Sequence, residues 1–156
     1  MIEKDIERAV IVAIERLNMP GLDIGGIWQP AEDGFVKGQE NPDASAIIRI
    51  VAAPRAFETF STPKAYITVA LSLSVRLETA PTGDALAGYT EPLMELLQGW
   101  QMSIETVRND LTVPGFAPCG FRLDGGNATL SGDPRNCWNV TQKITLRGIV
   151  KKGTST

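Results

Sequence analysis

Large apolar residues occupy every second position from Ile67 to Leu77, and small or polar residues such as Thr68, Ser72 and Ser74 fill the positions between them. Successive side chains of a strand point to opposite faces of the sheet, so this period of two predicts a strand with one apolar and one polar face. Eleven residues span about 36 Å, well beyond the usual strand of about five to six residues. We therefore expect a large sheet that is covered on one side only.

Two other segments carry apolar residues at helical spacing. Over residues 2–17 these recur every three or four positions, and charged residues, Glu3 and Glu7 among them, fill the remaining arc, which predicts an amphipathic helix with a solvated charged face. A second helix is predicted over residues 86–100. Because an interior proline clashes with the preceding turn, we expect a kink or a new helix start just before Pro92.

Further strands are predicted at residues 46–52, 104–113 and 119–123, the last ending at an Asp-Gly-Gly-Asn turn, and an alternating strand is predicted at 138–150. Prolines near both ends of residues 53–64 favour a hairpin connection there rather than continuous sheet. The order of the elements predicts an α+β fold, namely an antiparallel β-sheet with long strands, one face of which is covered by two amphipathic helices.

Composition narrows the class of protein. The chain has 156 residues, of which 43% are apolar and 21% charged, as expected for one domain over residues 1–152 with a disordered tail at 153–156. A net charge of −3 and the lack of a basic stripe argue against sequence-specific nucleic-acid binding. No apolar run of about 18 residues occurs and the charged N-terminus does not resemble a signal peptide, so no membrane partner is expected.

The chain contains no histidine, which excludes Ser-His-Asp and Cys-His catalytic sites and three-histidine zinc centres. It also has neither a P-loop nor the Rossmann glycine spacing. Asp124 and Asp133 could bind a hard cation together with Glu105 or Asp110, but Asp-Gly-Gly-Asn is more typical of a turn. We therefore expect no enzymatic activity, no cofactor and no metal.

Cys119 and Cys137 lie 18 positions apart and match no paired metal-binding spacing. Two reduced thiols are the simpler interpretation. A disulfide between them is the alternative, and an oxidising compartment would favour it.

Aromatic residues in polar segments are candidates for contact with another protein. Several exposed apolar residues on one edge would form an interface patch. Phe116 lies in such a segment, whereas Trp100 falls on an apolar helical face and is expected in the core. The small side chains on the polar face of the 67–77 strand would allow another chain to approach closely. The candidate interface residues are Trp28, Phe35, Phe57, Phe60, Thr68, Ser72 and Ser74. Phe57 and Phe60 could instead fold back onto their own hairpin.

The order and texture of the elements resemble those of the tail terminator, or tail-completion, proteins of long-tailed bacteriophages. The likeness rests on the charged opening helix, the long loop after it, the alternating strand at 67–77, a helix ending Glu-Leu-Leu-Gln-Gly-Trp-Gln at 95–101, the Asp-Gly-Gly-Asn turn and a closing strand with Arg-Gly near its end.

The resemblance implies a structural virion protein with an α+β fold. It would form a hexameric homo-oligomeric ring that caps the tail tube, ends tube polymerisation and joins the tail to the head connector. Its partners would be the tail tube protein and a head connector or neck protein, with DNA passing through the lumen. It would be assembled in the host cytoplasm and reside in the tail-neck region of the virion.

Two other classes stay open. A different head-to-tail neck or tail-tube subunit could have a similar build, and a tube subunit would polymerise into filaments where a terminator stops at one ring. A small α+β ligand-binding or hydrolase domain would instead require a deep pocket with convergent polar groups and a carboxylate whose pKa is strongly shifted.

Overall fold

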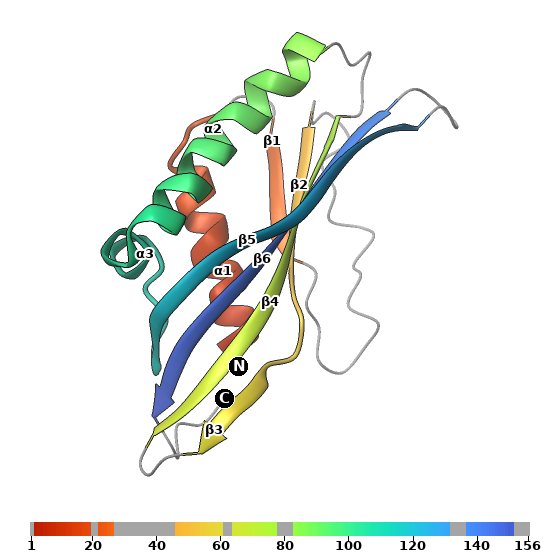
Figure 1. Cartoon of the computed structure of the whole chain (residues 1–156). Coiled ribbons are helices and arrows are strands. Elements are labelled where there is room, and N and C mark those ends of the chain that lie inside the picture. Colours follow the sequence, from red (N-terminus) through yellow and green to blue (C-terminus); the bar gives the residue numbers. More distant parts are fainter. Residues whose placement is uncertain are drawn as a thin grey trace.

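In the described part of the chain, three helices pack against one side of a single twisted sheet of six strands (Figure 1). The computed structural model describes residues 2–19, 22–26, 46–60, 64–77, 83–131 and 137–151. The elements are α1 (Ile2–Glu15), β1 (Leu22–Gly26), β2 (Ala46–Ala52), β3 (Ala56–Phe60), β4 (Lys64–Leu77), α2 (Gly83–Met102), α3 (Ile104–Asp110), β5 (Phe116–Ser131) and β6 (Cys137–Lys151).

The strand order is β1-β2-β4-β6-β5, and β3 pairs with the same edge of β4 as β2 does. All neighbouring pairs are antiparallel except β1 and β2, which run parallel, so the sheet is mixed at this edge. β4 and β6 pair without a register shift from Lys64↔Lys151 to Arg76↔Asn139. The predicted α+β class with long strands is confirmed.

The predicted alternation of β4 is confirmed by burial. Its odd-numbered residues from Ile67 to Val75 are at most 3% exposed and face the helices. They form the core with residues from the neighbouring strands and from all three helices, including Ile48, Ile50, Ile144, Leu146, Ile6, Val10, Leu93, Leu97 and Val107. The helices therefore cover one face of the sheet only.

The prediction that Glu3 and Glu7 lie on a solvated arc of α1 is wrong. They are only 4% and 3% exposed. The pairing of β1 with β2 ends at Gly26↔Ile50, and among the described residues β2 has no strand neighbour beyond that point on the side away from β4. There the Ala52 N–H donates to Glu7 Oε2 at 2.9 Å, and the Arg55 N–H donates to Glu3 Oε2 at 2.9 Å. The two carboxylates thus replace the missing strand.

Residues 53–64 do not form a simple hairpin connection. β3 continues the line of β2 along β4, with Ala52 opposite Leu71 and Ala56 opposite Thr68. The three residues 53–55 oppose only two residues of β4, which makes this a bulge. Pro54 lies inside the bulge, where a residue without a backbone N–H is tolerated.

Residues 104–113 are not a strand. Residues Ile104–Asp110 form α3, whose N-cap residue Ser103 accepts a hydrogen bond from the Thr106 N–H. Val107 and Leu111, four positions apart, are both buried on the inner side of this helix. Pro92 likewise does not interrupt α2, whose second half is held by the buried residues Leu93, Leu97 and Trp100.

The Asp-Gly-Gly-Asn segment is not a turn. β5 continues through it as far as Ser131, with register shifts between Pro118 and Gly120 and between Leu123 and Gly126. Each shift adds one extra residue to β5, with Cys119 unpaired in the first bulge and Asp124 and Gly125 opposite Lys143 in the second, so the strand stays paired with β6 while it twists.

Phe116 is buried, contrary to its assignment to an exposed loop, and its ring packs on Gly148 of the neighbouring strand. A Cβ at Gly148 would lie 2.3 Å from two ring carbons of Phe116 and 2.8 Å from the Ala117 carbonyl oxygen. We expect Gly148→Ala to lower the unfolding free energy by about 1–3 kcal/mol through overpacking. Urea denaturation measures this change.

Gly120→Ala is the matched control for that variant, because a Cβ there meets only Arg147 Cβ, at 3.5 Å. It should leave stability unchanged or raise it slightly. Equal losses in the two variants would contradict the role assigned to the Phe116 ring.

Candidate functional site: the open face of the sheet

The face of the sheet opposite the helices carries the candidate site. Among the described residues no helix packs on it, and α1 lies behind the strands in the view of Figure 1. We call it the open face. Its described residues on the two central strands are Tyr66, Thr68, Ala70, Ser72 and Ser74 of β4, paired with Ile149, Arg147, Thr145, Lys143 and Thr141 of β6.

Small and hydroxyl side chains dominate the centre of the open face. Ala70 is exposed, and Ser72, Ser74, Thr141 and Thr145 are half-buried. The Ser74 and Thr141 hydroxyls lie 3.5 Å apart across the two strands. From Thr68 to Ser74 the β4 side chains on this face are all small, so another backbone can approach this strip closely.

Cations surround this strip. Arg122, Lys143 and Arg147 are exposed and Arg49 is half-buried, whereas Asp124 is the one carboxylate among the described side chains of the open face. The chain as a whole has a net charge of −3. The open face is therefore basic on an acidic protein.

Tyr66 and Arg147 form one end of the open face. The Arg147 guanidinium carbon lies 4.7 Å from the centre of the Tyr66 ring, a cation–π geometry, and its Nη1 lies 3.8 Å from Cys119 Sγ. The aromatic ring keeps the guanidinium close to the sheet surface.

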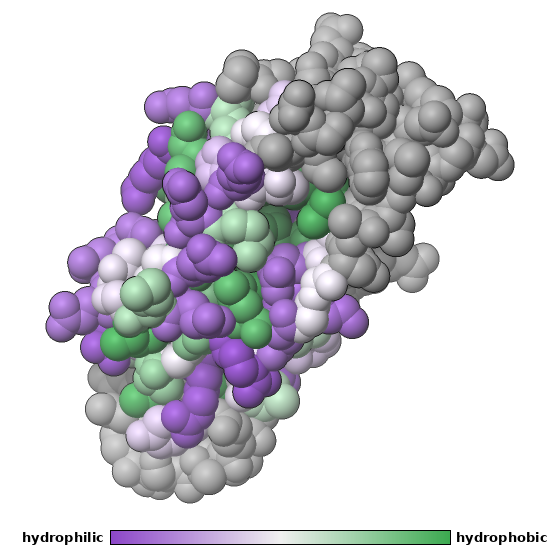
Figure 2. All heavy atoms as spheres, turned by 45° about the horizontal axis from the view of Figure 1, so that its top comes forward, coloured by the Kyte–Doolittle hydropathy of each residue, from purple (hydrophilic) through white to green (hydrophobic). Residues whose placement is uncertain are grey.

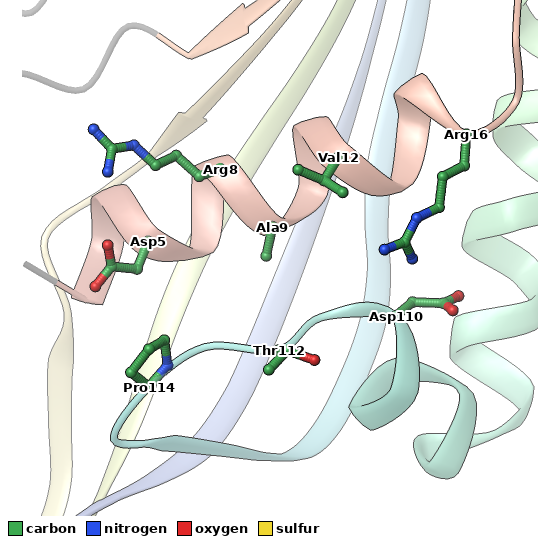
Figure 3. A pocket seen from close by; sticks show the side chains of 8 residues that line it. All are labelled: Asp5, Arg8, Ala9, Val12, Arg16, Asp110, Thr112 and Pro114. Atoms are coloured by element: carbon green, nitrogen blue, oxygen red, sulfur yellow. The ribbon is translucent and has the colours of Figure 1, made fainter.

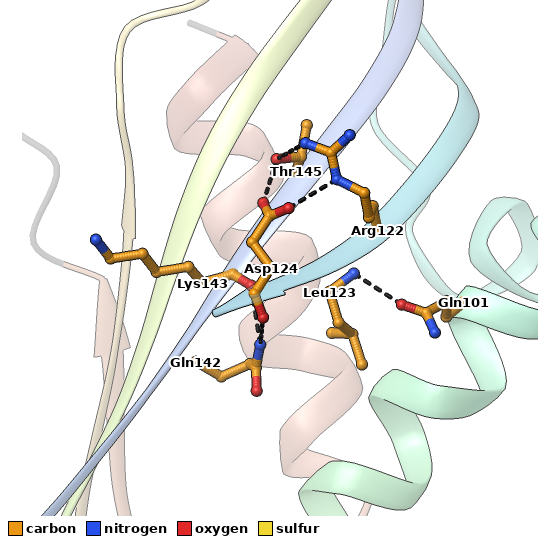
Figure 4. Close-up of polar contacts among 7 residues, drawn as sticks. All are labelled: Gln101, Arg122, Leu123, Asp124, Gln142, Lys143 and Thr145. Atoms are coloured by element: carbon orange, nitrogen blue, oxygen red, sulfur yellow. Dashed lines mark hydrogen bonds and ion pairs between the residues drawn. The ribbon is translucent and has the colours of Figure 1, made fainter. Parts of the chain in front are cut away.

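Arg122, Asp124 and Thr145 form a network near the middle of the face (Figure 4). Arg122 Nε donates to Asp124 Oδ1 at 2.7 Å, and the Thr145 hydroxyl donates to Asp124 Oδ2. The hydrogen bond from Thr145, followed by that from Arg122, holds the pKa of Asp124 below its ordinary value. Asp124 thus stays ionised and orients Arg122.

Two glutamines support the β5 bulge beneath this network. Gln142 Nε2 donates to the Asp124 carbonyl oxygen at 2.9 Å, and the Leu123 N–H donates to Gln101 Oε1 of α2 at 2.8 Å (Figure 4). These bonds satisfy backbone groups that the bulge withdraws from the strand ladder. The position of Asp124 is therefore determined from both sides of the sheet.

Three of the predicted interface residues, Thr68, Ser72 and Ser74, lie together on the open face and are half-buried. Phe57 and Phe60 lie on β3, with backbones opposite Ile67 and Ala65, but their side chains lie outside the described residues. Trp28 and Phe35 also lie outside the described residues.

Sequence reasoning missed the cations of this face. Lys143, Thr145 and Arg147 alternate with apolar residues along β6, so their shared parity was visible in the sequence. What the parity did not show is that β6 pairs in register with β4, which places these cations beside Ser72, Ala70 and Thr68.

Of the acidic residues considered for a cation site, the described ones (Asp124, Glu105 and Asp110) do not form a metal-binding group. Asp124 is bound to Arg122, Asp110 Oδ2 accepts a hydrogen bond from Trp100 Nε1, and Asp133 lies outside the described residues. Within the described ranges no three Cys, Asp or Glu residues lie close enough to hold a metal ion.

The two cysteines are far apart. Cys119 is free and lies beside Arg147, whereas Cys137 pairs with Ser131, ten residues away along β6, or about 33 Å. A disulfide requires Cα atoms within about 7 Å, so the alternative of an intramolecular bridge is wrong.

A shallow groove of about 270 Å³ separates α1 from the segment after α3 (Figure 3). Arg16 extends toward the end of α3 that carries Asp110, and Arg8 also lines the groove. The rest of its lining comes from Asp5, Ala9, Val12, Thr112 and Pro114. The groove is open to solvent, and its lining mixes charged and apolar residues.

No protein-family model matches this chain, and no curated protein matches its sequence. No helix in the described ranges is long and apolar enough to cross a lipid bilayer.

Proposed function

We propose that this protein is the subunit of a ring that caps the tail tube of a long-tailed bacteriophage, ends tube polymerisation and joins the tail to the head connector. It would act in the tail-neck region of the virion, in contact with the tube protein on one side and a connector or neck protein on the other.

The open face is the observation that carries this proposal. It is long, because β4 has 14 residues and β6 has 15, and it is lined by small hydroxyl and cationic side chains. A ring requires a heterologous contact, in which one surface of each subunit meets a different surface of the next. A sheet with helices on one side only has two chemically different sides available for such a contact.

The test is the state of assembly of the purified chain, measured by native mass spectrometry and negative-stain electron microscopy. A closed ring is expected, either alone or on tubes assembled from the tail tube protein of the same genome. Added to growing tubes, the protein should stop their elongation.

Long filaments of the chain alone would instead indicate a tube subunit. A species that stays monomeric both alone and with tubes, and that leaves tube length unchanged, would contradict the proposal.

A further inference from the structure

We propose that the open face of one subunit docks on the outer surface of α2 and α3 of a second copy of this chain. This inference deepens the proposed ring and rests on it, because it names the two surfaces that would meet around the ring. Charge complementarity between the two sides of the same molecule carries it.

The outer surface of α2 is acidic where the open face is basic. Glu91 and Glu95 are exposed on α2, and Glu105 is exposed on α3. Glu91 and Glu95 are four positions apart, so they project from the same side of the helix. No Lys or Arg occurs between Gly88 and Met102, so no cation offsets these carboxylates within that stretch of α2.

An apolar residue accompanies the carboxylates. Met102, at the end of α2, is 88% exposed, the largest exposure among the described large apolar residues. Its flexible side chain could fit the small Ala70 and Ser72 strip of the open face. The contact would thus combine a small apolar component with ion pairs around it.

The two surfaces lie on opposite sides of the sheet, since α2 packs on the core face through Leu93 and Leu97. A contact between opposite sides repeats from copy to copy, and it closes into a ring when the rotation between copies divides a full turn. A contact between the open faces of two subunits, or between their α2 surfaces, is disfavoured because like charges would face each other.

A nucleic acid is the competing occupant of a basic sheet face. The chain as a whole is acidic, whereas nucleic-acid-binding domains are usually basic. Hydrophilic residues are interspersed with apolar ones over the described surface in Figure 2, without one broad apolar patch. The acidic net charge favours an acidic protein surface over a phosphate backbone as the occupant.

Charge reversal tests the inference. Lys143→Glu with Arg147→Glu reverses the open face, and Glu91→Lys with Glu95→Lys reverses the helix side. Sedimentation velocity from about 10 μM to 1 mM measures self-association of each variant at low salt. Each reversal should weaken it about tenfold or more, and 0.5 M NaCl should weaken the native oligomer.

The four-site variant joins both reversals and restores the native net charge. It should regain association to within about threefold of the native chain, because opposite charges again face each other. Lys4→Glu with Arg8→Glu, on the exposed side of α1, is the matched control for the first reversal and should leave association unchanged. Thermal melts of all variants verify that they are folded.

The outcomes separate this inference from the proposed function. A closed ring that withstands both reversals overturns the inference and leaves the ring in place. An open filament that both reversals dissolve supports the docking surfaces and contradicts the ring. A chain that is monomeric over the whole range overturns the inference. So does an open-face reversal that removes binding to a duplex DNA fragment without affecting self-association.

Discussion

Replacing Glu3 with alanine should lower the unfolding free energy by about 3–5 kcal/mol. The Glu3 carboxylate accepts hydrogen bonds from the Arg55 backbone N–H at 2.9 Å and from Arg55 Nε at 3.1 Å and Nη2 at 2.7 Å. The Glu3 and Arg55 side chains are 6% and 13% exposed. Removal of the carboxylate therefore leaves a cation and a backbone donor without a partner where water has little access.

Urea denaturation followed by far-UV circular dichroism measures this loss. Glu15→Ala is the matched control, because Glu15 is the last residue of the same helix and is exposed. Its effect should stay within about 0.5 kcal/mol. Similar losses of unfolding free energy in Glu3→Ala and Glu15→Ala would contradict the conclusion that the contact between Glu3 and Arg55 stabilises this edge of the sheet.

The same carboxylate makes stability depend on pH. Burial alone would raise the pKa of Glu3, but the hydrogen bonds from Arg55 and its charge together outweigh burial and hold the pKa below the ordinary value of 4.5. A group with a lowered pKa in the folded state stabilises the fold above its unfolded pKa and loses this contribution as pH falls through the folded pKa.

The stability difference between the native chain and Glu3→Gln should therefore be constant near neutral pH and shrink as the pH falls below 4.5. Denaturation curves of both proteins over this range measure it. A difference that grows on acidification would contradict the assigned direction of the pKa shift.

Trp100→Ala should lower the unfolding free energy by about 3–5 kcal/mol as well. The indole is 1% exposed and packs edge-to-face on Phe121 of β5, with ring centres 5.5 Å apart at 81°. Its Nε1 donates to Asp110 Oδ2 of α3 at 2.7 Å. One side chain thus joins α2 to both α3 and β5.

Trp100→Phe separates the contribution of ring packing from that of the hydrogen bond to Asp110. It keeps an aromatic ring against Phe121 but removes the donor to Asp110, so about 1–3 kcal/mol of the loss should remain. Met102→Ala, two positions away and 88% exposed, should change stability by less than about 0.5 kcal/mol. A Trp100→Ala variant as stable as Met102→Ala would show that the α2–α3 corner does not depend on the indole.

The sequence predicted the elements whose pattern is long and regular. The period of two over 67–77 corresponds to β4 and the helical period over 2–17 to α1, and the repeating apolar face of each packs into the core. Trp100 is in the core, as its place on an apolar helical face indicated. Periodicity succeeds here because burial of one face requires it, whatever the partner is.

Elements with weak or interrupted patterns were misassigned. Residues 104–110 form a helix because an N-cap serine and two buried residues four positions apart outweigh the apparent alternation. The Asp-Gly-Gly-Asn segment remains in β5 because Gln101 and Gln142 supply hydrogen bonds that a free turn would obtain from water. Such partners come from residues that are distant along the chain.

The candidate site shows the same division. The polar parity of Thr68, Ser72 and Ser74 follows from local alternation, which any reader of the chain can see. Their meeting with Lys143 and Arg147, and the burial of Glu3 against the β2–β3 bulge, depend on strand order and register. Local periodicity shows which side chains share a face of one helix or strand. The register between distant strands, however, is determined by the packing of the whole core. The charge of the open face therefore depends on the tertiary structure.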